Sequence, residues 1–313
     1  RLRCDWSSDV CSSDLMAHIS GYLASTILVQ DGMLLAGIAL LLVGLAFKVA
    51  AVPFHAWTPD VYQGAPSPVV AWMAAGVKTA GFAAMLRVLV VTLGTHASDW
   101  RPAVAVLAAA SMVVGAWVAV LQTDVKRMLA YSSIAHAGFI LLGVQAASER
   151  GTAAVYVYLF VYTLLATGSF AVITTVGGRG DAAHGLDAYR GLARRQPVLA
   201  GAFTVLLLGQ AGIPFTGGFV AKLGVLAAVV EGRTYWVAMV AMAAAAVAAF
   251  VYLRILVAMY LEAPESDTAD RTEVPAGTRV VIGVACAGVL LIGLVPGFLL
   301  DIASDAVPVL VGG

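Results

Sequence analysis

Long apolar runs separated by short polar loops dominate the chain. A helix needs about 20 predominantly apolar residues to cross the hydrocarbon core of a bilayer. About eight runs reach this length, at residues 33–62, 66–92, 102–121, 125–146, 153–176, 197–230, 236–261 and 279–299. Pro53 interrupts the first run and Pro214 the sixth. The pattern predicts an all-α polytopic membrane protein with two proline-broken helices.

Composition agrees with this fold class and excludes others. Of the 313 residues, 61% are hydrophobic and only 12% are charged, with a formal net charge of zero. Soluble domains carry about 25% charged residues, and a strongly basic nucleic-acid-binding protein would not be neutral. The three cysteines, Cys4, Cys11 and Cys286, include no CxxC pair, so we expect neither a metal site nor a disulfide framework.

The first 15 residues, RLRCDWSSDVCSSDL, differ in character from the rest. They are rich in Ser and Asp and lack the apolar core of a signal peptide. We interpret residues 1–15 as a non-native artefact, such as a translated sequencing adapter joined to a gene fragment. A short native polar tail is the alternative. Residues 16–313 are expected to form one membrane domain, in which 16–31 are a loop or the end of a further span.

Basic residues predict the orientation of the bundle. The loops at 122–127, 177–196 and 262–279 carry most of the loop lysines and arginines. The opposite loops carry only three: Arg101, Arg150 and Arg233. Because cytoplasmic loops of membrane proteins are enriched in Lys and Arg, the first set is predicted to be cytoplasmic. The 181–195 segment has room for a short interfacial helix.

Three lysines lie inside the apolar runs. Lys48 precedes Pro53, Lys222 follows Pro214, and Lys78 lies in the second run. A charge at this depth costs about 3 kcal/mol or more and marks a functional site by default. Paired broken helices point to a transport site between repeats. The reversed order of lysine and proline fits an inverted repeat.

A histidine lies at mid-membrane depth in the run 125–146. His136 is about 15 Å along a helix from Lys126, and Ser132 and Ser133 share its face. A histidine beside hydroxyl groups can pass protons near neutral pH. A structural histidine bonded to a neighbouring helix is the alternative. Lys126 and Arg127 are interpreted as interfacial anchors.

The predicted spans contain no carboxylate at bilayer depth. The nearest acids, Asp60 and Glu231, lie beside span ends. Removing an ammonium group from water without a partner is costly. The lysines are therefore either compensated by a group outside this chain or poised to exchange protons, as a relay requires. A structural buried pair is the alternative to the relay.

Four segments carry a family resemblance: residues 53–82 with the run WTPDVYQGAP, 121–139, 189–197 and 206–223. They resemble the subunit N family of proton-pumping NADH-quinone oxidoreductase, bacterial respiratory complex I. The WTPDVYQGAP run separates this family from the related subunits L and M and from Mrp-type cation/proton antiporters.

The resemblance implies a fold of fourteen helices with two inverted five-helix repeats, of which this chain would hold about the last eight. It implies a subunit of a translocase whose proton relay uses Lys48, Lys78, Lys222 and His136. The family's intramembrane glutamate, the partner of the first lysine, would belong to the part that this chain does not match.

No cofactor or metal would bind here, because NADH, FMN, iron–sulfur clusters and quinone belong to partner subunits. The partners would be other membrane subunits of complex I, M and a K-like neighbour, in the bacterial inner membrane. No nucleic acid is expected to bind.

Two other functions remain possible from the sequence. The first is a cation/proton antiporter subunit, which shares the fold. Sodium-dependent flux unaffected by complex I inhibitors would favour it. The second is a structural membrane subunit that carries no protons. Under that hypothesis Lys78→Ala would leave pumping intact.

The predicted orientation can be tested with a single cysteine. With Cys4, Cys11 and Cys286 all replaced by Ser, Ala183→Cys should react with a membrane-impermeant thiol reagent in inside-out vesicles and not in intact cells. Thr95→Cys, in an opposite loop, is the control and should react in intact cells. Labelling of position 183 from the outside would contradict the orientation.

Overall fold

The computed structural model describes residues 8–25, 32–178, 180–181, 183–263 and 273–311. Within these ranges the regular structure is helical, apart from a single bridge between Asp124 and Gly185. The helices are α1 (Ser8–Ser25), α2 (Gly32–Val49), α3 (Trp57–Gly64), α4 (Ser67–Trp72), η1 (Met73–Val77), α5 (Lys78–Met85), η2 (Leu86–Thr92), η3 (Gly94–His96), α6 (Ala97–Leu121), α7 (Val125–Ala146), α8 (Glu149–Gly177), η4 (Leu186–Tyr189), α9 (Leu192–Arg195), α10 (Pro197–Ala211), α11 (Gly217–Glu231), α12 (Tyr235–Tyr260), α13 (Ala276–Leu294) and α14 (Gly297–Val311). The predicted all-α fold is confirmed.

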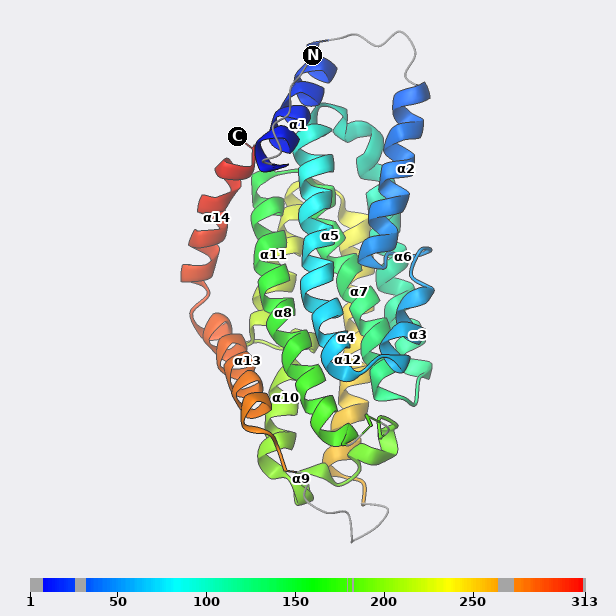
Figure 1. The fold of residues 1–313 in the computed structure, drawn as a ribbon, viewed down its shortest axis with the longest axis vertical. Helices are drawn as coiled ribbons and strands as arrows, with labels where there is room; N and C mark the ends of the chain where they lie inside the picture. Colours follow the sequence, from blue (N-terminus) through cyan, green and yellow to red (C-terminus); the bar gives the residue numbers. More distant parts are fainter. Residues whose placement is uncertain (1–7, 26–31, 179, 182, 264–272, 312–313) are drawn as a thin grey trace.

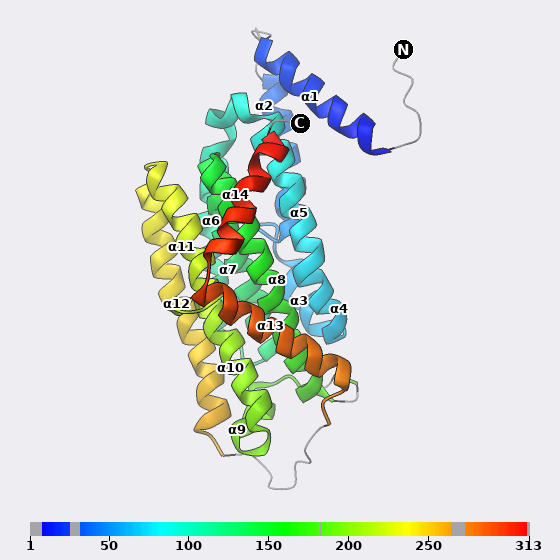
Figure 2. The ribbon, with the colours of Figure 1, turned by 90° about the vertical axis from the view of Figure 1, so that its left-hand side faces the viewer.

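The long helices run along one axis of the molecule (Figure 1). Seven helical segments of the described residues are long and apolar enough to cross a membrane. The helices α10 and α11, 15 residues each, are shorter and follow one another along the chain on either side of the break at Pro214. Figure 2 shows α13 lying obliquely across the bundle, where it packs on α8, α10 and α11.

Both predicted helix breaks are present. The first lies between α2 and α3, where Ala50 adopts a left-handed conformation with φ 62° before Pro53. The second lies between α10 and α11, where Gly212 has φ 82° before Pro214. Proline has no backbone N–H and disfavours helical geometry in the residue before it, so the helix ends ahead of each proline.

Three regions differ from the sequence prediction. The run 279–299 was expected as one span, but α13 ends at Leu294 and α14 begins at Gly297, because Pro296 cannot continue the helix. The second run contains two π-helical stretches, η1 and η2. Residues 16–25, expected as a loop or a span end, lie in α1. Of the proposed artefact, residues 1–7 lie outside the described residues and 8–15 belong to α1.

Helix α7 is the most enclosed of the spans, whereas most of α2 and α13 is exposed in this chain. Two glycines allow α6 and α7 to approach closely. A Cβ on Gly138 would lie 2.8 Å from the carbonyl oxygen of Ala108, and one on Gly115 would lie 2.5 Å from the backbone nitrogen of Ala135. Small residues at helix interfaces permit such backbone contact in membranes. This packing places the polar residues of α7 in the middle of the protein.

We expect Gly138→Ala to destabilise the protein. The added methyl group would press on the backbone of α6, and overpacking of this kind costs about 1–3 kcal/mol. The matched control is Gly283→Ala on α13, where a Cβ meets nothing within 4 Å and an alanine favours the helix. Unfolding in mixed micelles should show a lower free energy of unfolding for the first variant only. Equal values for the two variants would contradict the packing argument.

Candidate functional site

Lys78 is buried at the junction of η1 and α5. Its side chain is 3% exposed. The Nζ atom donates to the carbonyl oxygen of Ser133 at 2.7 Å and contacts the Ser133 Oγ at 2.5 Å, both on α7. It also lies 5.5 Å from the ring centroid of Tyr162, within the range of a cation–π interaction. The π-helical stretch η1 precedes Lys78 directly, and such stretches are frequent at functional sites.

Lys222 is buried on α11 and binds the end of α10. Its Nζ donates to the carbonyl oxygens of Gln210 at 2.9 Å and Ala211 at 2.7 Å. The last carbonyls of a helix have no partner within the helix and carry a partial negative charge. Gly212 leaves room for the lysine, because a Cβ there would lie 2.8 Å from the Lys222 Cδ. The break at Pro214 thus provides the oxygen atoms that hold Lys222.

His136 on α7 bonds to tyrosines of two other helices. Its Nδ1 lies 2.8 Å from the Tyr158 hydroxyl on α8, and its Nε2 lies 3.2 Å from the Tyr252 hydroxyl on α12. The imidazole centroid also lies 5.1 Å from the ring centroid of Tyr162, the ring that the Lys78 Nζ faces at 5.5 Å. A role for His136 in proton transfer between Lys78 and Lys222 stays a prediction.

Further polar side chains extend this network toward Lys222. The Tyr252 hydroxyl lies 2.5 Å from the Ser132 Oγ. Ser132 contacts the Gln210 Oε1 at 3.4 Å, and the Gln210 Nε2 donates to the Ser169 Oγ at 2.8 Å. The same Gln210 supplies a backbone carbonyl to Lys222. A buried hydrogen-bonded route therefore runs from His136 to the peptide that holds Lys222.

Oxygen atoms of neutral groups hold Lys78 and Lys222. Among the ion pairs of the described residues, none involves Lys78 or Lys222. Backbone carbonyls, one hydroxyl group and aromatic rings surround the two Nζ atoms. A proton can therefore leave either lysine without separating an ion pair within this part of the chain.

Lys48 is not part of this buried cluster. Its side chain is exposed in the last turn of α2. The stem passes α5, because a Cβ on Gly81 would lie 3.4 Å from the Lys48 Cγ. Gly81 lies three residues after Lys78 on α5, so the Lys48 stem contacts the helix that carries Lys78. A role for Lys48 in proton transfer stays a prediction.

Sequence reasoning missed several members of the site: Tyr158, Tyr252, Gln210 and Ser169. Each is a polar residue in the middle of an apolar run, and this position is the sequence feature that could have indicated it. That signal is weak, since a hydroxyl or amide group in a span can instead bond within its own helix. Only the crossing of α7, α8, α10 and α12 shows that these side chains meet.

A second polar cluster lies at the predicted cytoplasmic end. Lys126 is 1% exposed, and its Nζ donates to the Asp181 Oδ2 at 2.8 Å and to the Ala65 carbonyl oxygen at 2.7 Å. Asp181 also accepts from the backbone N–H of Ser67 at 2.7 Å and from its hydroxyl. The interpretation of Lys126 as an interfacial anchor is therefore wrong. Arg127, which pairs with the exposed Asp60 at 2.7 Å, lies at the surface.

This cluster borders a polar cavity of about 430 Å³, lined by the loop after α3, by Lys126 and by the loop after α8. Burial alone would raise the pKa of the Asp181 carboxyl. Hydrogen bonds from Lys126 and Ser67 outweigh it and hold that pKa below its ordinary value. The ion pair thus ties three segments together at this end of the bundle.

We expect Asp181→Asn to destabilise the protein and weaken its response to acid. Removing one partner leaves Lys126 buried without a countercharge, which costs about 3 kcal/mol. The carboxylate's contribution is present above the ordinary Asp pKa and is lost as the pH falls through the lowered folded value. Thermal unfolding between pH 7 and pH 3 measures both effects. Glu231→Gln, in the exposed pair with Arg150, is the control and should change stability by about 0–1 kcal/mol. Equal losses in the two variants would contradict a structural role of the ion pair.

Comparisons with known proteins identify the family. Residues 13–248 match the family described as NADH:quinone oxidoreductase/Mrp antiporter, transmembrane. NADH-quinone oxidoreductase subunit N 3 of Streptomyces griseus is 49% identical over 88% of this chain and 50% of its own length. The subunit N of Rhodococcus opacus is 46% identical over 87% of this chain and 50% of its own. The chain thus spans about half the length of these curated relatives.

A solved structure agrees with this assignment. A chain of respiratory complex I from Thermus thermophilus with bound aureothin superposes with a TM-score of 0.77 at 34% identity, covering 93% of this chain and 66% of that chain. The antiporter-like fold predicted from the sequence is confirmed. With a family match over most of its residues, this chain belongs to the NADH:quinone oxidoreductase/Mrp antiporter transmembrane family.

Proposed function

We propose that this chain is part of the membrane subunit N of an NADH:quinone oxidoreductase and that it translocates protons, coupled to electron transfer from NADH to quinone. The observation that carries the proposal is the pair of buried lysines, Lys78 and Lys222, together with a buried His136 that hydrogen-bonds to the hydroxyls of Tyr158 and Tyr252. The names of the relatives support the choice of complex. Residues 16–313 form the translocating domain in this proposal.

The partners of Lys78 suit a group that gains and loses a proton. A hydroxyl group both donates and accepts, whereas a carbonyl oxygen only accepts. The Ser133 hydroxyl can accept from the charged ammonium and donate to the neutral amine, while the Ser133 carbonyl accepts from either form. Both protonation states of Lys78 therefore find hydrogen bonds without movement of the backbone.

The two tyrosines allow His136 to pass a proton from one ring nitrogen to the other. A neutral imidazole has one donor and one acceptor nitrogen. Each nitrogen faces a tyrosine hydroxyl, which can take either role by rotation. From Tyr252 the route continues through Ser132 to Gln210, beside Lys222. The step between Ser133 and His136 spans one turn of α7, where a bridging water would complete the path.

The remaining elements of the proposal concern groups outside this chain. Lys48, exposed on α2, would face a carboxylate supplied from elsewhere in the assembly. The NADH, FMN, iron–sulfur clusters and quinone would be held by partner subunits. We propose other membrane subunits of complex I, M and a K-like neighbour, as direct partners. The bacterial inner membrane is the proposed location.

A substitution series at the lysines tests the proposal. Lys78→Met and Lys222→Met, each in the assembled complex, should lower NADH-driven proton pumping by about 10²-fold, the range of a lost acid–base group. Lys78→Arg and Lys222→Arg should lower it similarly, because an arginine stays protonated. The exposed Arg233→Met is the control and should pump normally. Dye quenching in inside-out vesicles measures pumping, alongside NADH oxidation.

The outcomes separate the alternatives. Pumping that survives in the arginine variants would show that these positions need only a positive charge, and the relay would be wrong. Normal pumping in the methionine variants would favour a structural subunit. Sodium-dependent proton flux without NADH would favour the antiporter alternative.

A further inference from the structure

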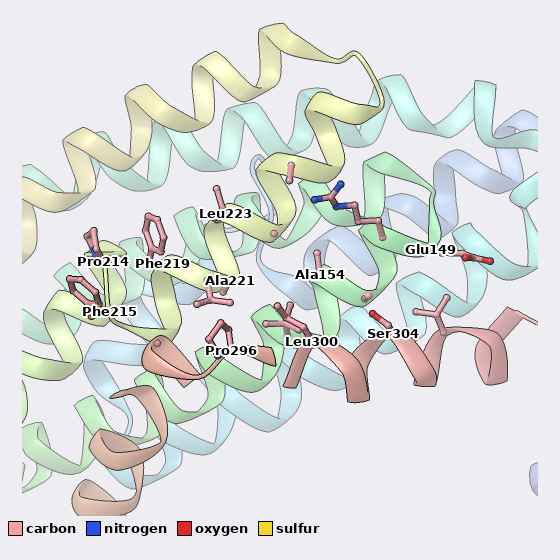
Figure 3. A pocket seen from close by; sticks show the side chains of 18 residues that line it. Glu149, Ala154, Pro214, Phe215, Phe219, Ala221, Leu223, Pro296, Leu300 and Ser304 are labelled. Carbon is pink, nitrogen blue, oxygen red and sulfur yellow. The ribbon is translucent and has the colours of Figure 1, made fainter. Parts of the chain in front are cut away.

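A groove of about 710 Å³ opens on the outer side of the bundle between α8, α11 and α14 (Figure 3). At one end it is lined by Glu149, Arg150 and Ser304. At the other end it is lined by Pro214, Phe215 and Pro296. The walls between the two ends are apolar or small side chains, such as Leu223, Leu300 and Ala227. The groove therefore has one polar end and a long apolar interior.

The groove has the length of one bilayer leaflet. Along α8 its lining residues run from Glu149 to Val157, a rise of about 12 Å. Half of the hydrocarbon core of a bilayer is about 15 Å thick. Glu149 lies in the first turn of α8, at the predicted outer surface, and Pro214 lies at the break between α10 and α11. The interior thus extends from the outer surface to the level of the helix break.

The inner end of the groove is closed by the turn between α13 and α14. A Cβ on Gly293 would lie 2.2 Å from the carbonyl oxygen of Phe215, so the two backbones are in direct contact. Pro296 then turns the chain into α14 along the groove. A helix that crosses the whole bilayer needs about 30 Å of continuous surface, which this closed end does not offer. The shape favours an acyl chain over a transmembrane helix.

Charges at the polar end select the kind of headgroup. Arg150 pairs with Glu231 at 3.1 Å, with the two side chains 61% and 64% exposed, and Glu149, which precedes Arg150 in the first turn of α8, lines the same end of the groove. Two carboxylates and one guanidinium suit a headgroup that carries both a phosphate and an amine. A purely anionic headgroup would meet an excess of negative charge.

We propose that this groove binds an amine-bearing zwitterionic phospholipid of the outer leaflet. One acyl chain fills the apolar interior, the phosphate lies by Arg150, and the amine lies by the carboxylates of Glu149 and Glu231. The acyl chain covers Phe215, Phe219 and Leu223, which are 70%, 37% and 54% exposed in this chain. It thereby supports the helix break whose other side holds Lys222.

Groove-filling variants test the proposal in the purified complex that contains the full subunit. Ala153→Phe on α8 and Ala227→Phe on α11 place a ring in the groove from facing walls. Ala243→Phe, on the exposed face of α12, is the matched control. Mass spectrometry should find one phosphatidylethanolamine fewer per complex in the two groove variants than in the control. Arg150→Gln should lower its retention at least fivefold after detergent washing, whereas Arg233→Gln, on the same side, should not.

A crosslinking experiment covers the case in which a groove variant fails to assemble. Leu223→p-benzoylphenylalanine keeps a large apolar side chain in the groove and reacts on illumination with whatever lies beside it. Attachment of phosphatidylethanolamine supports the proposal. Attachment to another polypeptide, to an anionic phospholipid alone or to detergent alone overturns it, as does an unchanged phosphatidylethanolamine content in both groove variants.

Discussion

An ammonium group inside a bilayer must be solvated by the protein itself, and the arrangement of α7, α10 and α11 follows from this need. In an unbroken helix the carbonyls of Gln210 and Ala211 would accept from residues four positions later. The break at Gly212 and Pro214 removes those donors and leaves the oxygens to Lys222. The broken helix end and the buried cation thus stabilise each other. Either one alone would be costly in lipid.

The position of α7 makes the other half of the site possible. Close contact with α6 at Gly115 and Gly138 keeps α7 in the centre of the bundle. From there it presents Ser133 to α5 and His136 to α8 and α12. At its beginning, the same helix presents Lys126 to the loops after α3 and α8. One enclosed helix therefore carries both polar clusters, one within the membrane and one at its predicted cytoplasmic surface.

The sequence was sufficient for features that are local. Pro53 and Pro214 located the breaks. The lone charges Lys78 and Lys222 and the mid-span His136 located the buried polar cluster that forms the candidate site, because each is costly in an apolar run. The sequence was insufficient where the partner is distant. Lys126 and Asp181 are 55 residues apart, so the ion pair depends on how two loops close. Likewise Tyr158 and Tyr252 join His136 only through the crossing of three helices, which no periodicity specifies.

Lys78 and Lys222 are held differently, and under the proposed relay this difference bears on how a proton would move between them. The hydrogen-bond partners of Lys222 are two carbonyl oxygens, which only accept, whereas Lys78 also meets the Ser133 hydroxyl, which can donate. Under the proposed relay, a proton would therefore reach the neutral Lys78 amine through the Ser133 hydroxyl. The lone pair of a neutral Lys222 must instead receive its proton from a group that approaches it separately, such as a water molecule beside Gln210. The backbone carbonyl of Gln210 accepts from Lys222, and the Gln210 side chain bonds to Ser132 and Ser169. A shift of Gln210 would therefore change the contact with Lys222 and the contacts with the two serines at the same time. The end of α10 therefore joins the backbone contact of Lys222 to the hydrogen-bonded chain that leads through Ser132 and Tyr252 to His136.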